Sequence, residues 1–233
     1  MSMLVTDLIL PAFNEALALP RVIEAIPPGV VRHIYVVDNG SQDDTARTAA
    51  ALGAIVLFEP RRGYGAACLR GLQHVASSDD APDALVFMHA DGSDDPGQIP
   101  ALLQPITRQG QDLVIGSRKL GFVDDGAMRM LDKISQRVAV ALIRAVYGQR
   151  YTDLGGFRAV RLPALVALHL TDDGPGFDVE MQVKAVKAGL RVAEVPVRFR
   201  KRADGPARTH SLGESAIASS RMLYTIFRHS TSR

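Results

Sequence analysis

The chain has 233 residues, of which 47% are hydrophobic and 22% are charged. This length and composition suit one globular domain with a sizeable core, and they exclude a chain that is disordered as a whole. A formal net charge of +2 is too small to indicate a nucleic-acid partner. The single cysteine, Cys68, excludes a disulfide within the chain and is expected to be a small core residue.

No segment of the sequence has the features of a signal peptide or of a membrane-spanning helix. The apolar stretch at residues 4–10 is short and has no basic leader. The most apolar stretch, residues 138–146, is interrupted by Arg144, and it falls short of the ~18 apolar residues that a spanning helix needs. We therefore expect a cytoplasmic protein that is either soluble or peripheral at the cytosolic face of a membrane.

Strand and helix patterns alternate along the first half of the chain. The expected strands are residues 4–10, 31–37, 54–58, 85–88 and 112–115, and the expected helices are residues 19–26, 45–52, 65–76 and the stretch that begins at Pro96. Strands separated by helices of this length predict right-handed βαβ units and a mainly parallel sheet.

After residue 121 the pattern changes to long amphipathic helices. Apolar residues recur with a helical period over residues 131–145 and 179–186, and a last, weakly amphipathic helix is expected over residues 212–227. Residues 192–197 are expected to form a strand, and Pro196 within it predicts a position at the edge of the sheet.

The stretch around Asp91 carries the densest cluster of acidic residues after a predicted strand. The apolar strand at residues 85–88 is followed at once by His89, Asp91, Asp94 and Asp95. Acidic groups at the C-terminal end of a parallel strand lie where open α/β sheets bind ligands, and carboxylates there can hold a divalent cation that carries a diphosphate. Asp94 and Asp95 are better explained as caps of the following helix, whereas Asp91 precedes the cap and is predicted to be a ligand.

Two further strand ends carry polar clusters, at residues 11–15 and 38–44. In a doubly wound sheet these ends lie beside the Asp91 stretch. Glu15 could then bond ribose hydroxyls, and Asp38 could accept a hydrogen bond from a base N–H. The alternative is that Asn14 with Glu15 only begins a helix and that Asp43 or Asp44 caps the helix at Thr45. The sequence lacks a GxGxxG fingerprint and a Walker lysine motif, which counts against a dinucleotide-binding Rossmann domain and a P-loop.

Six motifs, in this order, resemble those of family-2 glycosyltransferases. They are Pro11-Ala-Phe-Asn-Glu15, Val37-Asp-Asn-Gly-Ser-Gln-Asp-Asp-Thr45, Arg62-Gly-Tyr-Gly-Ala66, Ala90-Asp-Gly-Ser-Asp-Asp-Pro96, Gly116-Ser-Arg118 and Asp153-Leu-Gly-Gly-Phe-Arg158. Two later motifs, Gly176-Phe-Asp-Val-Glu-Met181 and Glu194-Val-Pro-Val-Arg198, resemble the polyprenyl-phosphate (dolichol-phosphate) sugar transferase branch of that family. The resemblance covers nearly the whole chain.

The resemblance implies a GT-A fold, which is an α/β fold with a mostly parallel twisted sheet flanked by helices. It implies one domain over residues 1–233, with a nucleotide-sugar-binding half at 1–118 and an acceptor-binding half at 119–233. The implied reaction is the inverting transfer of a hexose from a GDP-mannose or UDP-glucose type donor to a polyprenyl phosphate, with Mg²⁺ or Mn²⁺. Two alternatives stay open: a soluble glycosyltransferase with a small polar acceptor, and a non-catalytic nucleotide-binding module.

The resemblance also implies roles for individual residues. Asp91 would bind the metal. The family commonly has Asp-x-Asp where this chain has His89-Ala-Asp91, so His89 would either be a weak ligand that shifts the preference toward Mn²⁺ or only pack. Arg118 would hold the diphosphate or the acceptor phosphate. Asp153 is the candidate general base, with a structural turn role as the alternative. The nucleotide sugar would contact Pro11, Phe13, Glu15, Asp38, Gly40, Arg62, Gly65 and Asp91, and the acceptor phosphate would contact Arg129, Arg158, Arg200 and Arg202.

A lipid acceptor would bring the chain to a membrane surface. The amphipathic stretches at residues 128–147 and 212–227, together with the basic run at residues 198–210, are suited to that contact. The alternatives are that the helices pack against the domain and that the basic run is a solvated face. For Glu180 the family analogy predicts a position facing the cleft, against an ordinary exposed helix position as the alternative.

Overall fold

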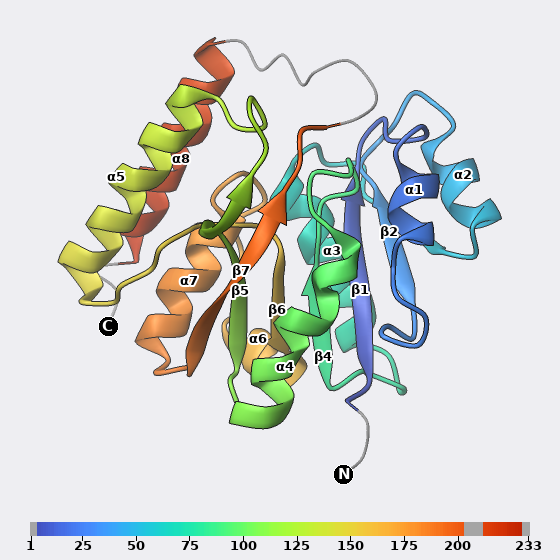
Figure 1. The fold of residues 1–233 in the computed structure, drawn as a ribbon, viewed down its shortest axis with the longest axis horizontal. Coiled ribbons are helices and arrows are strands. Elements are labelled where there is room, and N and C mark those ends of the chain that lie inside the picture. The colour runs from blue at the N-terminus through green and yellow to red at the C-terminus, as the bar shows by residue number, and fades with distance from the viewer. Residues whose placement is uncertain (1–3, 203–211, 230–233) are drawn as a thin grey trace.

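The structure is a computed structural model, and the residues described are 4–202 and 212–229, without the side chains of 212–219. At its centre lies one seven-stranded sheet in the order β3-β2-β1-β4-β6-β5-β7 (Figure 1). The strands are β1 (Thr6–Ala12), β2 (Ile34–Asp38), β3 (Ile55–Phe58), β4 (Ala84–Phe87), β5 (Leu113–Val123), β6 (Arg158–Arg161) and β7 (Val192–Phe199). The helices are α1 (Leu19–Glu24), α2 (Thr45–Ala51), α3 (Tyr64–Ala76), the 3₁₀ turn η1 (Pro96–Gln98), α4 (Ile99–Gln109), α5 (Met130–Tyr147), α6 (Leu162–Ala167), α7 (Phe177–Lys187) and α8 (Leu212–Arg228).

The sheet is mainly parallel, as the alternation of strands and helices predicts. β1 pairs in parallel with β2 and β4, β2 with β3, and β5 with β7. The exception is β6, which is antiparallel to both β4 and β5. Strand β6 was not predicted from the sequence, because its four residues begin and end with arginine and show no apolar run.

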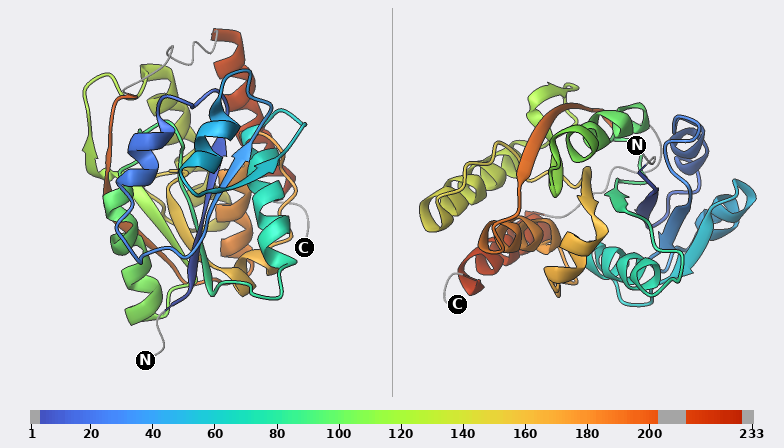
Figure 2. Two further views of the ribbon diagram at one scale, coloured as in Figure 1. Left: turned by 90° about the vertical axis from the view of Figure 1, so that its right-hand side faces the viewer. Right: turned by 90° about the horizontal axis from the view of Figure 1, so that it is seen from below.

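Helices cover both faces of the sheet, as the two views of Figure 2 show. Alternate residues of β1 supply the two cores, because side chains on a strand point to opposite faces. Leu8 and Leu10 belong to the cluster that α1, α2 and α4 complete, and Ile9 belongs to the cluster that α3, α5, α6, α7 and α8 complete. Cys68 is fully buried in the second cluster, as predicted.

The edge strand β7 confirms the prediction made from Pro196. Its neighbour β5 extends to Val123, well beyond the predicted end at residue 115. The two strands stay paired past an irregularity between Ser117 and Phe122. Gly121 allows this pairing, since a Cβ there would lie 2.0 Å from the carbonyl oxygen of Val197.

The helices α5 and α8 run side by side at one margin of the molecule (Figures 1 and 2). The Tyr147 hydroxyl near the end of α5 donates a 2.6 Å hydrogen bond to the carbonyl of Ile226 on α8. Among the described residues, no helix has the length and apolar character needed to cross a membrane. On α5, Met130, Ile134 and Val138 are nevertheless exposed. The basic residue Arg208, part of the run noted in the sequence, lies outside the described residues.

Candidate functional site

The C-terminal ends of β1, β2 and β4 meet at one edge of the sheet, as the sequence predicts. The loops after β1 and β2 are joined by two hydrogen bonds: the Ser41 Oγ accepts from the Asn14 N–H at 3.0 Å, and the Asn14 Oδ1 accepts from the Gln42 N–H at 2.8 Å. Asn14 has a φ of 55°, a left-handed conformation that Asn adopts more readily than most residues. The loops after β1 and β2 therefore form one continuous surface at this edge of the sheet.

Four of the residues predicted to bind the nucleotide sugar gather at this edge. The Arg62 guanidinium lies 3.8 Å above the centroid of the Phe13 ring, a cation–π contact. Gly40 has a φ of 76°, and the Arg62 Nε lies 3.8 Å from the place that a Gly40 Cβ would occupy. The Asp38 carboxylate accepts a 2.9 Å hydrogen bond from the Ser41 N–H. These contacts place Phe13, Asp38, Gly40 and Arg62 together at the end of β2.

The buried Glu15 carboxylate has a partner that its position in the sequence does not reveal. Its Oε2 accepts a 2.7 Å bond from Arg202, which follows the edge strand β7. The predicted ribose contact and one of the predicted acceptor arginines thus form one ion pair. The end of β7 also reaches the acidic loop, where Phe199 forms a β-bridge with Asp94.

Asn39 holds the Arg62 loop in place, a role that the sequence analysis did not assign. Its side-chain amide donates to the carbonyls of Glu59 and Arg61, and its Oδ1 accepts from the Gly63 N–H at 2.8 Å. Asn39 directly follows β2, between Asp38 and Gly40, both of which were predicted to contact the nucleotide sugar. An amide side chain at this position was the only sequence signal for its role.

Pro11 and Gly65 occupy buried positions that do not support the predicted contacts with the nucleotide. Pro11 lies within β1 beside Val37 of β2. Gly65 lies at the start of α3, where its N–H donates to the carbonyl of Gly174 at 3.2 Å. A Cβ on Gly65 would lie 2.2 Å from the Asp172 carbonyl oxygen. Position 65 therefore requires glycine, because the backbone of residues 172–174 lies too close for a side chain.

Replacing Gly65 with alanine is expected to destabilise the protein by about 1–3 kcal/mol, because the new Cβ meets backbone that must shift. Chemical denaturation followed by far-UV circular dichroism measures the loss. Gly97→Ala is the matched control, since a Cβ there meets only the Asp95 carboxylate, at 3.3 Å. Equal stability of the Gly65 variant and the wild type would show that the loop does not restrict this position.

Beyond β4, Asp91 and Asp94 have different partners. The Asp91 Oδ1 accepts from the N–H and hydroxyl of Ser93. Asp94 is buried and accepts from the backbone N–H of His89 at 3.0 Å and from its Nδ1 at 2.7 Å. The predicted cap is confirmed for Asp95, which accepts from the Gly97 N–H. It is wrong for Asp94, whose carboxylate is directed at His89.

The imidazole of His89 is held on two sides. It stacks on Tyr64 with ring centroids 5.7 Å apart, and Asp94 binds its Nδ1. Burial disfavours the charged imidazolium, but the Asp94 carboxylate outweighs burial and raises the pKa of His89 to about 9. A protonated imidazole has no lone pair for a metal. The predicted metal role of His89 therefore requires loss of a proton, and Asp91 is the stronger candidate.

The residues present fit a metal that takes most of its ligands from a substrate. Among the residues that the structure covers, no three His, Cys, Asp or Glu side chains are grouped to hold a metal. Mg²⁺ is commonly held by one or two carboxylates together with water and substrate phosphates, so such a group is not needed. Asp91, just after β4, supplies a carboxylate that could be the protein's ligand to such a metal. When bound, the metal would neutralise charge on a leaving diphosphate.

Arg118 and Asp153 form a buried ion pair next to this edge. The Asp153 carboxylate accepts from the Arg118 backbone N–H at 2.7 Å, from its Nε at 2.8 Å and from its Nη2 at 2.6 Å. Burial alone would raise the pKa of Asp153, but the bonds from Arg118 lower it below its usual value. A carboxylate with a lowered pKa is a weak proton acceptor. The arrangement favours a structural role for Asp153 over the predicted general base.

The arginines predicted to hold the acceptor phosphate are all paired with acids. Arg129 pairs with Asp132, Arg200 with Asp95 and Arg202 with Glu15. Arg158 is fully buried, and it binds the Gly155 carbonyl and the Asp178 carboxylate. The prediction for Arg158 is therefore not supported, because its guanidinium joins the Gly-Gly loop to α7 inside the protein. Glu180 is also buried instead of facing a cleft, and it binds Lys184 and the backbone of Asp172.

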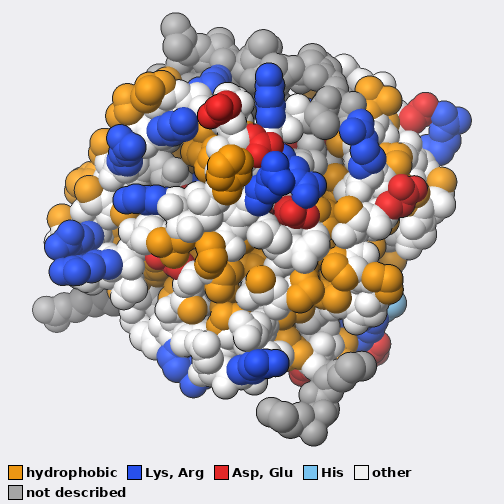
Figure 3. All heavy atoms as spheres, viewed as in Figure 1, with side chains coloured by type: hydrophobic (Ala, Val, Ile, Leu, Met, Phe, Trp, Pro, Cys, Tyr) orange, Lys and Arg blue, Asp and Glu red, His pale blue; other side chains and the backbone are white. Residues whose placement is uncertain are grey.

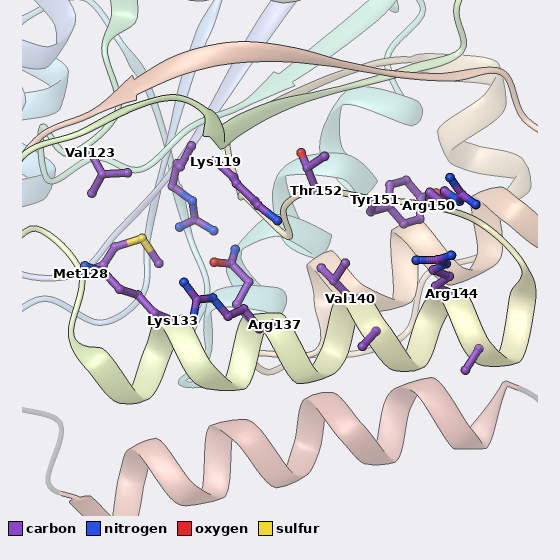
Figure 4. Close-up of a pocket in the computed structure, with 14 residues that line it drawn as sticks. Lys119, Val123, Met128, Lys133, Arg137, Val140, Arg144, Arg150, Tyr151 and Thr152 are labelled. Carbon is purple, nitrogen blue, oxygen red and sulfur yellow. The ribbon is translucent and has the colours of Figure 1, made fainter.

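A groove of about 960 Å³ lies between α5, the end of β5 and the loop at residues 150–152 (Figure 4). Its apolar wall includes Val123, Met128 and Val140, and no acidic residue lines it among the described residues. Its cations are Arg118, Lys119, Lys133, Arg137, Arg144 and Arg150. Figure 3 shows lysine and arginine side chains beside hydrophobic ones over this side of the molecule. The groove thus suits an anionic ligand with apolar parts.

Arg118 links the groove to the acidic strand end. It lines the groove, and its guanidinium carbon lies 5.2 Å from the centroid of the Phe199 ring. Phe199 in turn forms the β-bridge with Asp94. An anion in the groove and a diphosphate at Asp91 would therefore be neighbours.

Comparison with known proteins now identifies the family. A model of glycosyl transferase family 2 matches residues 7–168, more than half of the chain. The chain belongs to glycosyl transferase family 2. The match covers the edge of the sheet with Glu15, Asp38 and Asp91, and also the Arg118–Asp153 pair.

Several relatives cover most of the chain. An uncharacterized glycosyltransferase of Mycobacterium tuberculosis is 35% identical over 211 residues, which are 90% of this chain and 92% of the relative. An undecaprenyl-phosphate mannosyltransferase of Micrococcus luteus is 32% identical and covers 90% of each chain. A polyprenol monophosphomannose synthase of Mycolicibacterium smegmatis is 30% identical over 96% of this chain and 84% of its own. These relatives support the polyprenyl-phosphate branch that the later motifs indicate.

The fold is shared with a solved glycosyltransferase. Glucosyl-3-phosphoglycerate synthase of Mycobacterium tuberculosis, in complex with Mn²⁺, UDP and glucosyl-3-phosphoglycerate, superposes with a TM-score of 0.77. It is 26% identical and covers 99% of this chain and 81% of its own. The match confirms the GT-A fold that the resemblance implied.

Proposed function

We propose that this family-2 glycosyltransferase transfers a hexose, with inversion, from a nucleotide-diphosphate sugar to a polyprenyl phosphate. The transfer is proposed to depend on Mg²⁺ or Mn²⁺ and to take place at the cytosolic face of a membrane. The observation that carries this proposal is the position of the basic groove, which begins at Arg118 beside the acidic end of β4. The relatives named for undecaprenyl phosphate and polyprenol monophosphomannose supply the acceptor class.

On the donor side, the edge of the sheet has groups for each part of a nucleotide sugar. Phe13 with Arg62 offers a flat, charged surface near Asp38, which has an acceptor for a base N–H. The Glu15 carboxylate could accept hydrogen bonds from ribose hydroxyls if the Arg202 guanidinium moves away from it or turns toward a phosphate. Asp91 supplies the carboxylate for a metal on the diphosphate.

On the acceptor side, Arg118 and its cationic neighbours would hold a phosphate for attack on the sugar. A phosphate oxygen is already ionised at neutral pH, so it needs little help from a general base. This agrees with the lowered pKa of Asp153, which suits an ion-pair partner better than a base. Developing charge on the leaving diphosphate would be stabilised by cations in this cleft.

A second candidate is transfer to a small phosphorylated acceptor in water. It is favoured by the likeness to a synthase whose solved complex contains glucosyl-3-phosphoglycerate. The two candidates share the donor and the anionic acceptor group, and they differ in whether a lipid is needed.

Thermal unfolding with a panel of GDP-, UDP- and CDP-sugars, with and without Mn²⁺ or Mg²⁺, tests the donor side. A donor at ~100 times its dissociation constant adds about 2.7 kcal/mol to the free energy of unfolding, which raises the midpoint measurably. We expect a shift with one nucleotide that increases with metal. Absence of a shift with any of these nucleotide sugars would contradict the proposed donor.

A further inference from the structure

The cations of the groove fall into two groups. Figure 4 shows Lys119, Lys133 and Arg137 toward one end of the groove and Arg144 and Arg150 toward the other, with Val140 between them. We refer to Arg118, Lys119, Lys133 and Arg137 as the proximal cations and to Arg144 and Arg150 as the distal pair. The proximal group includes Arg118, which pairs with Asp153 and lies against the Phe199 ring near the acidic strand end.

The distal pair is exposed and carries no ion pair or side-chain hydrogen bond with any residue that the structure describes. The contrast is with Arg129, Arg200 and Arg202, each of which has an acid at 3.0 Å or less. Both arginines line a groove that has no acidic lining residue among the described residues, so a bound anion would gain from both positive charges. Arg144 lies in the last turn of α5, where a cation interacts favourably with the helix dipole. This interaction accounts for Arg144 but not for Arg150, which lies beyond the helix.

Local structure brings Arg150 back to Arg144. α5 ends at Gly148, whose φ of 74° reverses the chain and whose N–H donates to the Arg144 carbonyl at 3.0 Å. The residues after Arg150 are firmly anchored, since the Tyr151 hydroxyl donates to the Gln182 carbonyl and the Thr152 N–H donates to Glu194. The backbone is thus held on both sides of Arg150, by Gly148 at the end of α5 and by Tyr151 and Thr152 against α7 and β7.

The two groups of cations lie toward opposite ends of the groove. Arg144 is seven residues from Arg137 and eleven from Lys133 on the same helix, which correspond to about 10 and 16 Å along the axis. Val140, Ala141 and Ala145 form the wall between them. A ligand that reaches both ends therefore needs two anionic groups joined by a partly apolar spacer.

We propose that the distal pair is a second phosphate subsite, distinct from the one that holds the reacting phosphate at Arg118. Its ligand is a phosphate monoester or diester that lies in the groove while an acceptor phosphate occupies the proximal cations. This inference deepens the proposed function, but it concerns binding and can be tested without turnover. The second phosphate has two sources, the headgroup of an anionic phospholipid next to a lipid acceptor or a second phosphate on the acceptor itself.

Isothermal titration with decanediol bisphosphate, and with decyl phosphate as the single-phosphate control, tests the subsite. We expect the bisphosphate to bind the wild type at least tenfold more tightly than the monophosphate. The double variant Arg144→Gln/Arg150→Gln is expected to lose that advantage and to keep the affinity for decyl phosphate. Arg108→Gln, an exposed arginine in the last turn of α4, is the matched surface control and is expected to bind as the wild type does.

Vesicle binding distinguishes the two sources. Co-sedimentation compares vesicles of phosphatidylcholine alone with vesicles that also contain phosphatidylglycerol. If the distal variant loses a preference for phosphatidylglycerol, the headgroup supplies the phosphate; if only the bisphosphate advantage is lost, the acceptor supplies it. Both outcomes support the subsite. A bisphosphate that binds no more tightly than the monophosphate, or an advantage that survives in the distal variant, overturns it even if donor binding and sugar transfer are intact.

Discussion

Replacing Asp91 with asparagine is expected to lower the rate constant for sugar transfer by roughly 10²–10³-fold, the size of effect seen when one charge-stabilising group is removed from an active site. Asparagine keeps an oxygen that can accept from Ser93, so the loop should keep its shape. It loses the negative charge that attracts a divalent cation. Initial rates over a range of Mn²⁺ concentrations measure the change, and the metal requirement should rise together with the loss of rate.

Asp95→Asn is the control for this experiment, because it removes a carboxylate from the same loop. Asp95 caps η1 and pairs with Arg200 at 2.8 Å, so its replacement should cost less than tenfold in rate. A rate for Asp91→Asn close to that of the wild type, with the same metal response, would contradict the assignment of Asp91 as the metal ligand.

Replacing Asp153 with asparagine is expected to destabilise the protein by about 3–5 kcal/mol, the usual cost of removing one partner from a buried ion pair. Asp153 is 1% exposed and accepts from three atoms of Arg118, from Gln136 and from the Leu154 N–H. The variant leaves the Arg118 charge in a site that is largely removed from water. Urea denaturation measures the loss, and Asp132→Asn, at an exposed pair, should cost less than about 1 kcal/mol.

The pH dependence of this difference follows from the lowered pKa of Asp153. An unfolded aspartate titrates near pH ~3.9, so the stabilisation from the folded carboxylate is fully present above that range. It is lost as the pH falls through the lower, folded-state pKa. The gap between wild type and Asp153→Asn should therefore narrow toward pH 3 and below. If Asp153 is instead a general base, the variant keeps its stability and loses the dependence of the rate on deprotonation.

The regular alternation of strands and helices was predictable because its signal is local. In α4, Ile99, Leu102, Leu103 and Ile106 are buried at the spacing that a helix requires. The strand β6 was not predictable in this way, because Arg158 is buried only by virtue of partners at Gly155 and Asp178. Such compensation of a charge depends on the tertiary structure and leaves no periodic pattern in the sequence.

The site was predictable where strand ends determine it and not where distant side chains pair. Phe13, Asp38 and Arg62 meet because parallel strands end at one edge. The pairing of Glu15 with Arg202 joins residues 187 positions apart, and no spacing in the sequence indicates it. By contrast, the cations of α5 did offer a local signal, since Lys133, Arg137 and Arg144 lie on one side of a single helix.

The most direct test of the account is transfer of labelled sugar from the donor that stabilises the protein. Undecaprenyl phosphate in vesicles and phosphoglycerate in water are offered as acceptors, each with and without Mn²⁺. We predict metal-dependent label in the lipid phosphate, and no label with Asp91→Asn. Transfer to phosphoglycerate alone would contradict the lipid acceptor and select the second candidate. No transfer to either acceptor, by a protein that binds the donor, would contradict the proposed reaction.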